Sequence, residues 1–165
     1  MKKKILPYCA AAVFLCCCGC AAGAVSRDIR IEAEDFSSEE GGSVVIRTDK
    51  PGVSGRSISY WDDKWHIVNW SFDVPAAGRY RLSLRSASPQ NALRRLWING
   101  RDCGTFSVPA TGGNGSSPEN WRECSPLCGG KPVVVDLAVG KNTLSLENMD
   151  GNSLNLDSIL LRRAD

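Results

Sequence analysis

Histidine is almost absent from this chain of 165 residues, in which His66 is the only one. An HExxH zinc motif and a histidine-based metal cluster are therefore excluded. A Ser-His-Asp triad would have to use His66, and no G-x-S-x-G turn supplies a nucleophile. No P-loop and no G-x-G-x-x-G segment follows a candidate strand, which disfavours nucleotide chemistry. These absences predict a protein that is not an enzyme of the common classes.

Long apolar runs are confined to the N-terminus. Lys2 to Lys4 form a positive segment, Ile5 to Cys18 is apolar, and Ala22 to Ala24 offers a small-residue cleavage site. Residues 1–24 are therefore predicted to be a secretory signal peptide.

A second interpretation of this leader concerns the segment Cys17 to Cys20, which resembles a bacterial lipobox with Cys17 where leucine is usual. Lipidation at Cys20 and ordinary cleavage before Val25 both remain open. Either predicts an exported protein, secreted or a cell-envelope lipoprotein, whose membrane contact is limited to an N-terminal lipid.

A strong charge of one sign is also missing. Without the leader, 17 Lys and Arg stand against 18 Asp and Glu, a net charge of −1. No basic run is present, so nucleic acid is not an expected partner.

Cysteine is scarce outside the leader, which holds five of the eight. The other three are Cys103, Cys124 and Cys128, and an oxidising compartment favours a disulfide among them. Their pairing stays open. A zinc site built from all three lacks a nearby histidine and is disfavoured.

Apolar and polar residues alternate with a period of two, which is typical of β-strands, and no segment shows helical periodicity. The turn at Ala76 to Gly78 predicts a hairpin between the runs 68–74 and 80–84, and Asn99-Gly100 predicts another. Residues 28–165 suffice for one all-β domain, a β-sandwich of two antiparallel sheets. The irregular stretch Pro109 to Lys131 is expected to be an ordered, disulfide-stapled binding loop.

Acidic residues crowd the start of the predicted domain in Ile31 to Phe36, "IEAEDF". Glu32 and Glu34 would share one face of a strand, at carboxyl separations of about 5 to 9.5 Å that a glycosidase could use. Two neighbours that point the same way do not flank a bond in a cleft, so catalysis is disfavoured. A hard cation such as Ca²⁺ would reconcile the two charges, with Asp157 as a third ligand. Solvent-facing strand residues are the simpler alternative.

Six segments together resemble carbohydrate-binding modules of families 6 and 35. They cover most of Ile29 to Arg163 in the order found in those families. The segments are IEAEDF, FDVPAAGRYRLSLRSAS (72–88), LWING (96–100), VPATGG (108–113), VGKNTLSLEN (139–148) and LNLDSILL (154–161). The resemblance implies a jelly-roll β-sandwich of the galactose-binding-domain type. It also implies a structural Ca²⁺ at Glu32, Glu34 and Asp157, with carbonyls of 54–57 as further candidates.

The resemblance further implies a sugar site in loops at one end of the sandwich, where aromatic rings pack on a pyranose and an Asn binds its hydroxyls. The residues expected there are Tyr60, Trp61, Trp121 and Asn155, and Asp62 and Asp63 are possible additional contacts. Trp70 and Tyr80 follow strand alternation and are assigned to the core, while Trp65 and Trp97 fit either role.

One departure from the families is Asn114, which stands where they usually carry the Trp of "TGGW". The expected function is non-catalytic binding of a poly- or oligosaccharide, for adhesion or to bring a partner glycoside hydrolase to its substrate. The alternative is a structural or protein-interaction lipoprotein on the same sandwich.

Overall fold

A computed structural model describes residues 28–164 of the chain. The predicted signal peptide and Cys20 lie outside the described residues. Within the described part, no helix is long and apolar enough to cross a membrane.

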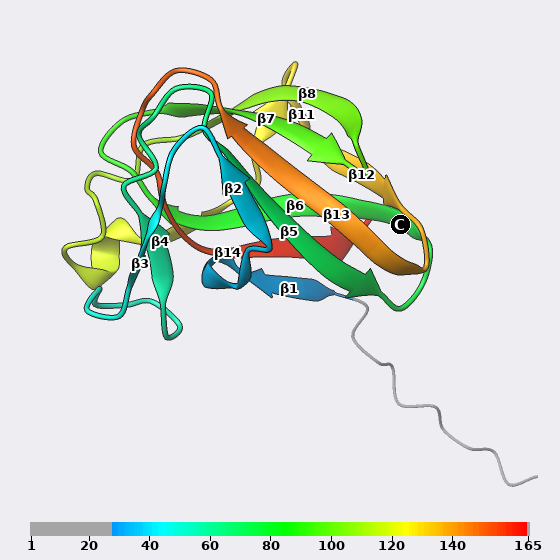
Figure 1. The fold of residues 1–165 in the computed structure, drawn as a ribbon, viewed down its shortest axis with the longest axis horizontal. Coiled ribbons are helices and arrows are strands. Elements are labelled where there is room, and N and C mark those ends of the chain that lie inside the picture. Colours follow the sequence, from blue (N-terminus) through cyan, green and yellow to red (C-terminus); the bar gives the residue numbers. More distant parts are fainter. Residues whose placement is uncertain (1–27, 165) are drawn as a thin grey trace, which may run out of the picture.

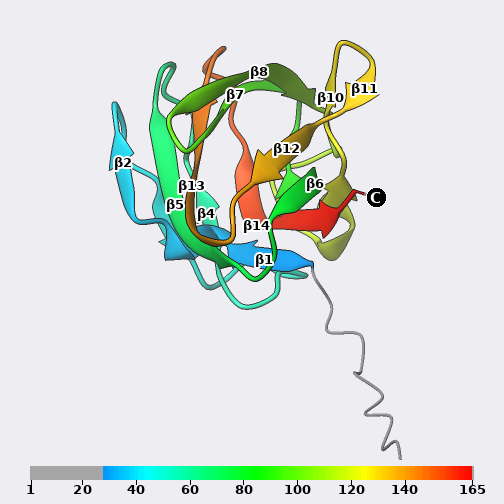
Figure 2. The ribbon, with the colours of Figure 1, turned by 90° about the vertical axis from the view of Figure 1, so that its right-hand side faces the viewer.

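Two antiparallel sheets face each other, and together they confirm the all-β sandwich (Figures 1 and 2). The first sheet contains, in spatial order, β12 (Val134–Leu137), β6 (Gly78–Ala87), β14 (Asn155–Arg163), β4 (Ser57–Ser59) and β3 (Val45–Arg47), with β1 (Ile29–Glu32) on β14 and β9 (Arg122–Cys124) on β6. The second contains β11 (Lys131–Pro132), β10 (Leu127–Cys128), β8 (Arg101–Val108), β7 (Ala92–Ile98), β13 (Gly140–Asn148), β5 (Ile67–Val74) and β2 (Ser38–Glu40). Two short 3₁₀ helices complete the fold, η1 (Ala33–Asp35) and η2 (Pro118–Asn120).

The hairpin predicted at Asn99-Gly100 is confirmed by β7 and β8, which pair from Ile98 and Arg101 onward. The hairpin predicted around Ala76 to Gly78 is wrong, because β5 pairs with β2 and β13 in one sheet while β6 lies in the other. The chain crosses there between sheets, so the alternating apolar residues of the two strands face each other across the core instead of lying side by side.

The core between the sheets is built from the inward residues of each strand. Trp70 and Tyr80 are fully buried in it, as the alternation predicts. Burial of a large aromatic contributes about 1.5–3 kcal/mol, so these side chains hold the two sheets together.

The stretch Pro109 to Lys131 is more regular than expected, since it contains η2, β9 and β10. The predicted disulfide staple is not present, because Cys103, Cys124 and Cys128 are all free. Pairing of β9 with β6 and the hydrogen bond from Thr111 N to Ser88 O (2.8 Å) fix the stretch instead.

Candidate functional site

A pocket of about 100 Å³ opens at the end of the sandwich where β4 finishes and β14 begins. Most of its walls are side chains that can donate or accept hydrogen bonds. Its lining residues are Arg47, Lys50, Ser59, Tyr60, Asn114, Ser153 and Asn155. The structure thus brings Tyr60 and Asn155, two of the four residues predicted for sugar binding, to one place.

Tyr60 follows β4 directly and is 55% exposed. Its φ of +61° is a left-handed conformation that costs a non-glycine residue about 1–2 kcal/mol. The Arg47 guanidinium lies 6.0 Å from the ring centroid. The exposed Tyr60 ring contributes nothing to the core, although its backbone conformation is strained. Such strain is typical of functional positions.

Asn155 is the first residue of β14 and is buried, with its amide donating to the Asn114 carbonyl at 2.5 Å. Lys50 Nζ donates to the same carbonyl at 3.0 Å, so three segments of the chain meet at this oxygen. Ser59 Oγ is buried in the pocket wall without a hydrogen-bond partner. The pocket therefore offers fixed amide, ammonium and hydroxyl groups beside an aromatic ring, which is the combination that a sugar requires.

Trp61 differs from the expectation, because it is fully buried. Its ring packs edge-on against Trp70 (6.3 Å between centroids) and under Arg94 (4.6 Å), and its Nε1 donates to the His66 carbonyl. The left-handed turn at Tyr60 sends consecutive aromatic residues in opposite directions, one outward and one into the core.

Trp121 is also buried, at 5% exposure, and does not line the pocket. A Cβ on Gly115 would lie 2.6 Å from its ring, so the glycine lets the loop close over the indole. Five lining residues were not predicted from the sequence: Arg47, Lys50, Ser59, Asn114 and Ser153. Of these, only Asn114 had a signal in the sequence. The departure from "TGGW" was its signal.

The packing of Trp121 can be tested at Gly115. We expect Gly115→Ala to lower the free energy of unfolding by about 1–3 kcal/mol, because the new methyl group meets the indole. Gly112→Ala is the matched control, since its φ is also positive (+91° against +76°) but no atom lies within 4 Å of the added Cβ. Chemical denaturation would measure both, and equal losses would show that backbone strain, not the contact with Trp121, sets the cost.

Asp62 and Asp63 are exposed and lie outside the pocket lining. The Asp63 carboxylate lies near the buried His66 ring, since a Cβ on Gly42 would approach both within 2.8 Å. His66 Nε2 is 3.0 Å from Glu39 Oε2, which gives it a structural partner.

The three predicted calcium ligands lie near one another but are accompanied by arginines. Asp157 is fully buried and accepts hydrogen bonds from Ser54 N (3.1 Å) and Oγ (3.2 Å). Arg85 Nε lies 2.9 Å and Arg30 Nη2 3.6 Å from its second oxygen. Arg30 Nε also pairs with Glu32 at 2.6 Å.

Glu34 sits beside this group with a side chain only 7% exposed. Burial raises the pKa of its carboxyl, and the charge of Glu32 adds to the rise. Arg56 Nε lies 3.4 Å from one oxygen, while Oε2 is buried without a hydrogen-bond partner.

Among the described residues, no group of three or more His, Cys, Asp or Glu side chains is arranged as a metal site. Three observations nevertheless fit a hard cation. Glu34 Oε2 and Ser57 Oγ are buried oxygens without a hydrogen-bond partner, and Asp157 Oδ2 is a buried oxygen held by ion pairs with Arg85 (2.9 Å) and Arg30 (3.6 Å). Oxygen donors of this kind are the ligands that Ca²⁺ takes.

Comparison with solved structures identifies the fold. A family 35 carbohydrate-binding module from Clostridium thermocellum superposes with a TM-score of 0.66 at 20% identity, covering 83% of this chain and 98% of that one. A family 35 module from Cellvibrio japonicus gives 0.64 at 23% identity, covering 84% and 94%. A family 6 module of a Cellvibrio mixtus lichenase, solved with cellotriose, gives 0.63 at 22% identity, covering 86% and 100%.

No protein-family model matches the chain. Among curated proteins, it is 29% identical over 128 residues to a 3-O-alpha-D-galactosyl-alpha-L-arabinofuranosidase of Bifidobacterium longum subsp. longum. The match covers 73% of this chain but only 11% of that enzyme. The predicted resemblance is confirmed at the level of fold: this chain has the β-sandwich of carbohydrate-binding modules of families 6 and 35.

Proposed function

We propose that the protein is a non-catalytic carbohydrate-binding module that binds a poly- or oligosaccharide through the pocket at Tyr60 and Asn155. The observation that carries the proposal is the exposed, strained Tyr60 ring beside the buried Asn155 amide. A pyranose packs its C–H face on such a ring and exchanges hydrogen bonds with fixed polar groups.

Binding without turnover agrees with the chemistry of the pocket. Glycoside hydrolysis needs two carboxylates that flank the bond, whereas the described lining holds amide, hydroxyl and cationic groups with one phenol. Glu32 and Glu34 lie outside this lining.

Calcium belongs to the proposal as a structural ion held by Glu32, Glu34 and Asp157. When bound, it would supply positive charge to carboxylates that the fold gathers and partly desolvates. The residues that ligate it lie on β1, η1 and β14, so the ion would join three segments, one of which contains Asn155.

The cellular role proposed here is that of an exported protein, secreted or lipid-anchored, that adheres to a glycan or brings a glycoside hydrolase to it. The leader sequence supports export. The similarity to part of a Bifidobacterium arabinofuranosidase supports a hydrolase as partner.

The test is affinity electrophoresis in gels that contain xylan, mannan, galactan, β-glucan, pectin or mucin glycans, run with the unmodified protein and two variants. We expect at least one glycan to retard the protein, and Tyr60→Gly to weaken that binding by about tenfold or more. Glycine also tolerates the positive φ, so the variant should be no less stable, and up to about 1 kcal/mol more stable.

Trp65→Gly is the matched control. Trp65 is likewise an exposed aromatic (54%) with a positive φ (+72°), but it lies outside the pocket lining. Retardation that survives Tyr60→Gly would contradict the site, and absence of retardation by every glycan would favour the protein-interaction role.

A further inference from the structure

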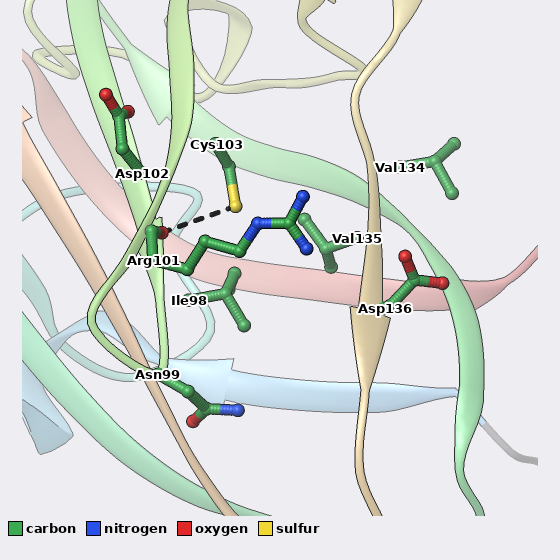
Figure 3. Close-up of a pocket in the computed structure, with 8 residues that line it drawn as sticks. All are labelled: Ile98, Asn99, Arg101, Asp102, Cys103, Val134, Val135 and Asp136. Carbon is green, nitrogen blue, oxygen red and sulfur yellow. Dashed lines mark hydrogen bonds between the residues drawn. The ribbon is translucent and has the colours of Figure 1, made fainter.

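Another cavity lies far along the sandwich from Tyr60, between β8 of one sheet and β12 of the other (Figure 3). Its volume of about 440 Å³ falls in the range of small-molecule sites. The lining consists of Ile98, Asn99, Arg101, Asp102, Cys103, Val134, Val135 and Asp136, none of which lines the Tyr60 pocket.

One wall of the cavity is the free edge of β12. This strand is the last in its sheet and pairs only with β6. Leu82 N donates to Val133 O (2.9 Å), while Val133 N donates to Pro126 O. Because antiparallel pairs alternate, Val135 and Leu137 also direct backbone groups toward β6. The N–H and C=O groups of Val134 and Asp136 therefore point away from β6, toward the cavity, where they are open to a ligand.

The opposite wall contains a β-bulge at Cys103. Trp97 pairs with Asp102 and Leu96 with Gly104, so Cys103 is the extra residue. Figure 3 shows its side chain directed to the inside of the gap between the strands. Bulges commonly re-aim a side chain beside a functional site. Here the bulge adds a half-buried thiol to the apolar surface of Ile98 and Val135.

Arg101 reaches from β8 across the cavity toward β12 (Figure 3). Among the described residues, its guanidinium has neither an ion-pair nor a hydrogen-bond partner, whereas the nearby Arg95 is paired with Asp102 at 2.5 Å. Asp136 points to the other side of β12 in the same view. An unpaired guanidinium with five donors is suited to bidentate recognition of a planar or tetrahedral anion.

We infer that this cavity is a second binding site, which takes a small anionic ligand bearing one carboxylate or sulfate group. Arg101 binds the anion, the open backbone groups of Val134 and Asp136 exchange hydrogen bonds with the ligand's polar edge, and Ile98 and Val135 contact its apolar part. The site is independent of the glycan pocket, because it shares no residue with it.

The experiment is a ¹⁵N-NMR titration with sodium glucuronate, sodium sulfate and, as the neutral counterpart, glucose. We expect glucuronate, sulfate or both to shift the amide signals of Cys103, Val134 and Asp136 with saturation, and glucose to leave them unchanged. Shifts by both anions identify a general oxyanion site, and shifts by glucuronate alone identify a carboxylated sugar.

Arg101→Gln should weaken this binding by about tenfold or more, because a charge-assisted hydrogen bond contributes about 1.5–3 kcal/mol. Arg79→Gln is the matched control, since Arg79 is an exposed arginine on β6 outside the cavity lining. Absent shifts, shifts confined to the surroundings of Tyr60, or equal affinity in Arg101→Gln would each overturn the inference.

Alkylation of the reduced protein with iodoacetamide gives a second measurement. A ligand in the cavity should slow modification of Cys103 while the exposed Cys128 reacts at an unchanged rate. Burial raises the pKa of the Cys103 thiol, so both rates are compared at one alkaline pH. Equal rates for Cys103 with and without a saturating anion would contradict occupancy of the cavity.

Discussion

Saturating Ca²⁺ is expected to raise the melting temperature of the protein by about 10 °C over its value in EDTA. A ligand at 100 times its Kd adds about 2.7 kcal/mol to the free energy of unfolding, and for a domain of this size each kcal/mol corresponds to about 3–5 °C. The physical reason is that Glu34 holds a buried oxygen without a hydrogen-bond partner, which a cation would satisfy, beside the buried carboxylate of Asp157. Scanning calorimetry in both buffers measures the shift.

The variant Glu34→Gln distinguishes the effect of bound calcium on stability from the effect of the Glu34 charge itself. The raised pKa of Glu34 means that its charged form destabilises the metal-free fold. This destabilisation is absent in acid, where the carboxyl is protonated in both states. It grows as the pH rises through and above the ordinary pKa of glutamate, because the folded state holds the proton more tightly than the unfolded chain. At neutral pH in EDTA, the variant should therefore be as stable as the unmodified protein or more so, and it should lose most of the response to calcium.

Glu40→Gln, an exposed carboxylate on β2, is the control and should keep the full calcium response. A calcium response that persists in Glu34→Gln would remove this residue from the proposed site. No response in the unmodified protein would mean that, among the described residues, Arg30, Arg56 and Arg85 balance these carboxylates without a metal.

Replacing Trp61 with alanine should reduce the free energy of unfolding by about 3–5 kcal/mol and the melting temperature by roughly 10–20 °C. Trp61 is fully buried, and Arg94 stacks on it. Arg94 is itself buried, which lowers its pKa to about 10, and the indole adds a cation–π contact to the hydrogen bonds that its guanidinium donates to Asn148 and to nearby carbonyls. Removing the ring leaves both a cavity and a weakened cation–π contact.

Thermal denaturation of Trp61→Ala beside Trp65→Ala tests this prediction. Trp65 is 54% exposed, so its loss should change the free energy of unfolding by less than about 1 kcal/mol. A Trp61→Ala protein that melts normally but no longer binds glycan would instead restore Trp61 to the role that the sequence predicted for it.

The β-pattern predicted the sandwich because alternation reports which residues face a core, and Trp70 and Tyr80 were assigned by that rule alone. The same rule does not report which sheet a strand joins, and this is why the hairpin at Ala76 to Gly78 was wrong. Alternation is identical whether two strands lie side by side or face each other across the core.

Of the residues that line the candidate site, the sequence predicted Tyr60 and Asn155, and Asn155 only through the resemblance to the two module families. The other polar lining residues come from separate loops and strands, and no local pattern signals that they meet. Tyr60 is exposed and Trp61 is buried because Tyr60 has a positive φ. The residue type does not signal this conformation when the residue is not glycine. The burial of Trp121 depends on a contact with Gly115 that arises only when the loop folds.

The course of β14 determines how the module would present its pocket when it is joined to something else. Asn155 opens the strand at the pocket, and Leu161, near the other end, pairs with Ile29 of β1. At about 3.3 Å per residue, this separates the pocket from Ile29, where β1 begins, by roughly 20 Å. A lipid anchor or enzyme attached ahead of Asp28 would thus enter at the base of the sandwich and leave Tyr60 at the outer tip, free to reach an insoluble surface.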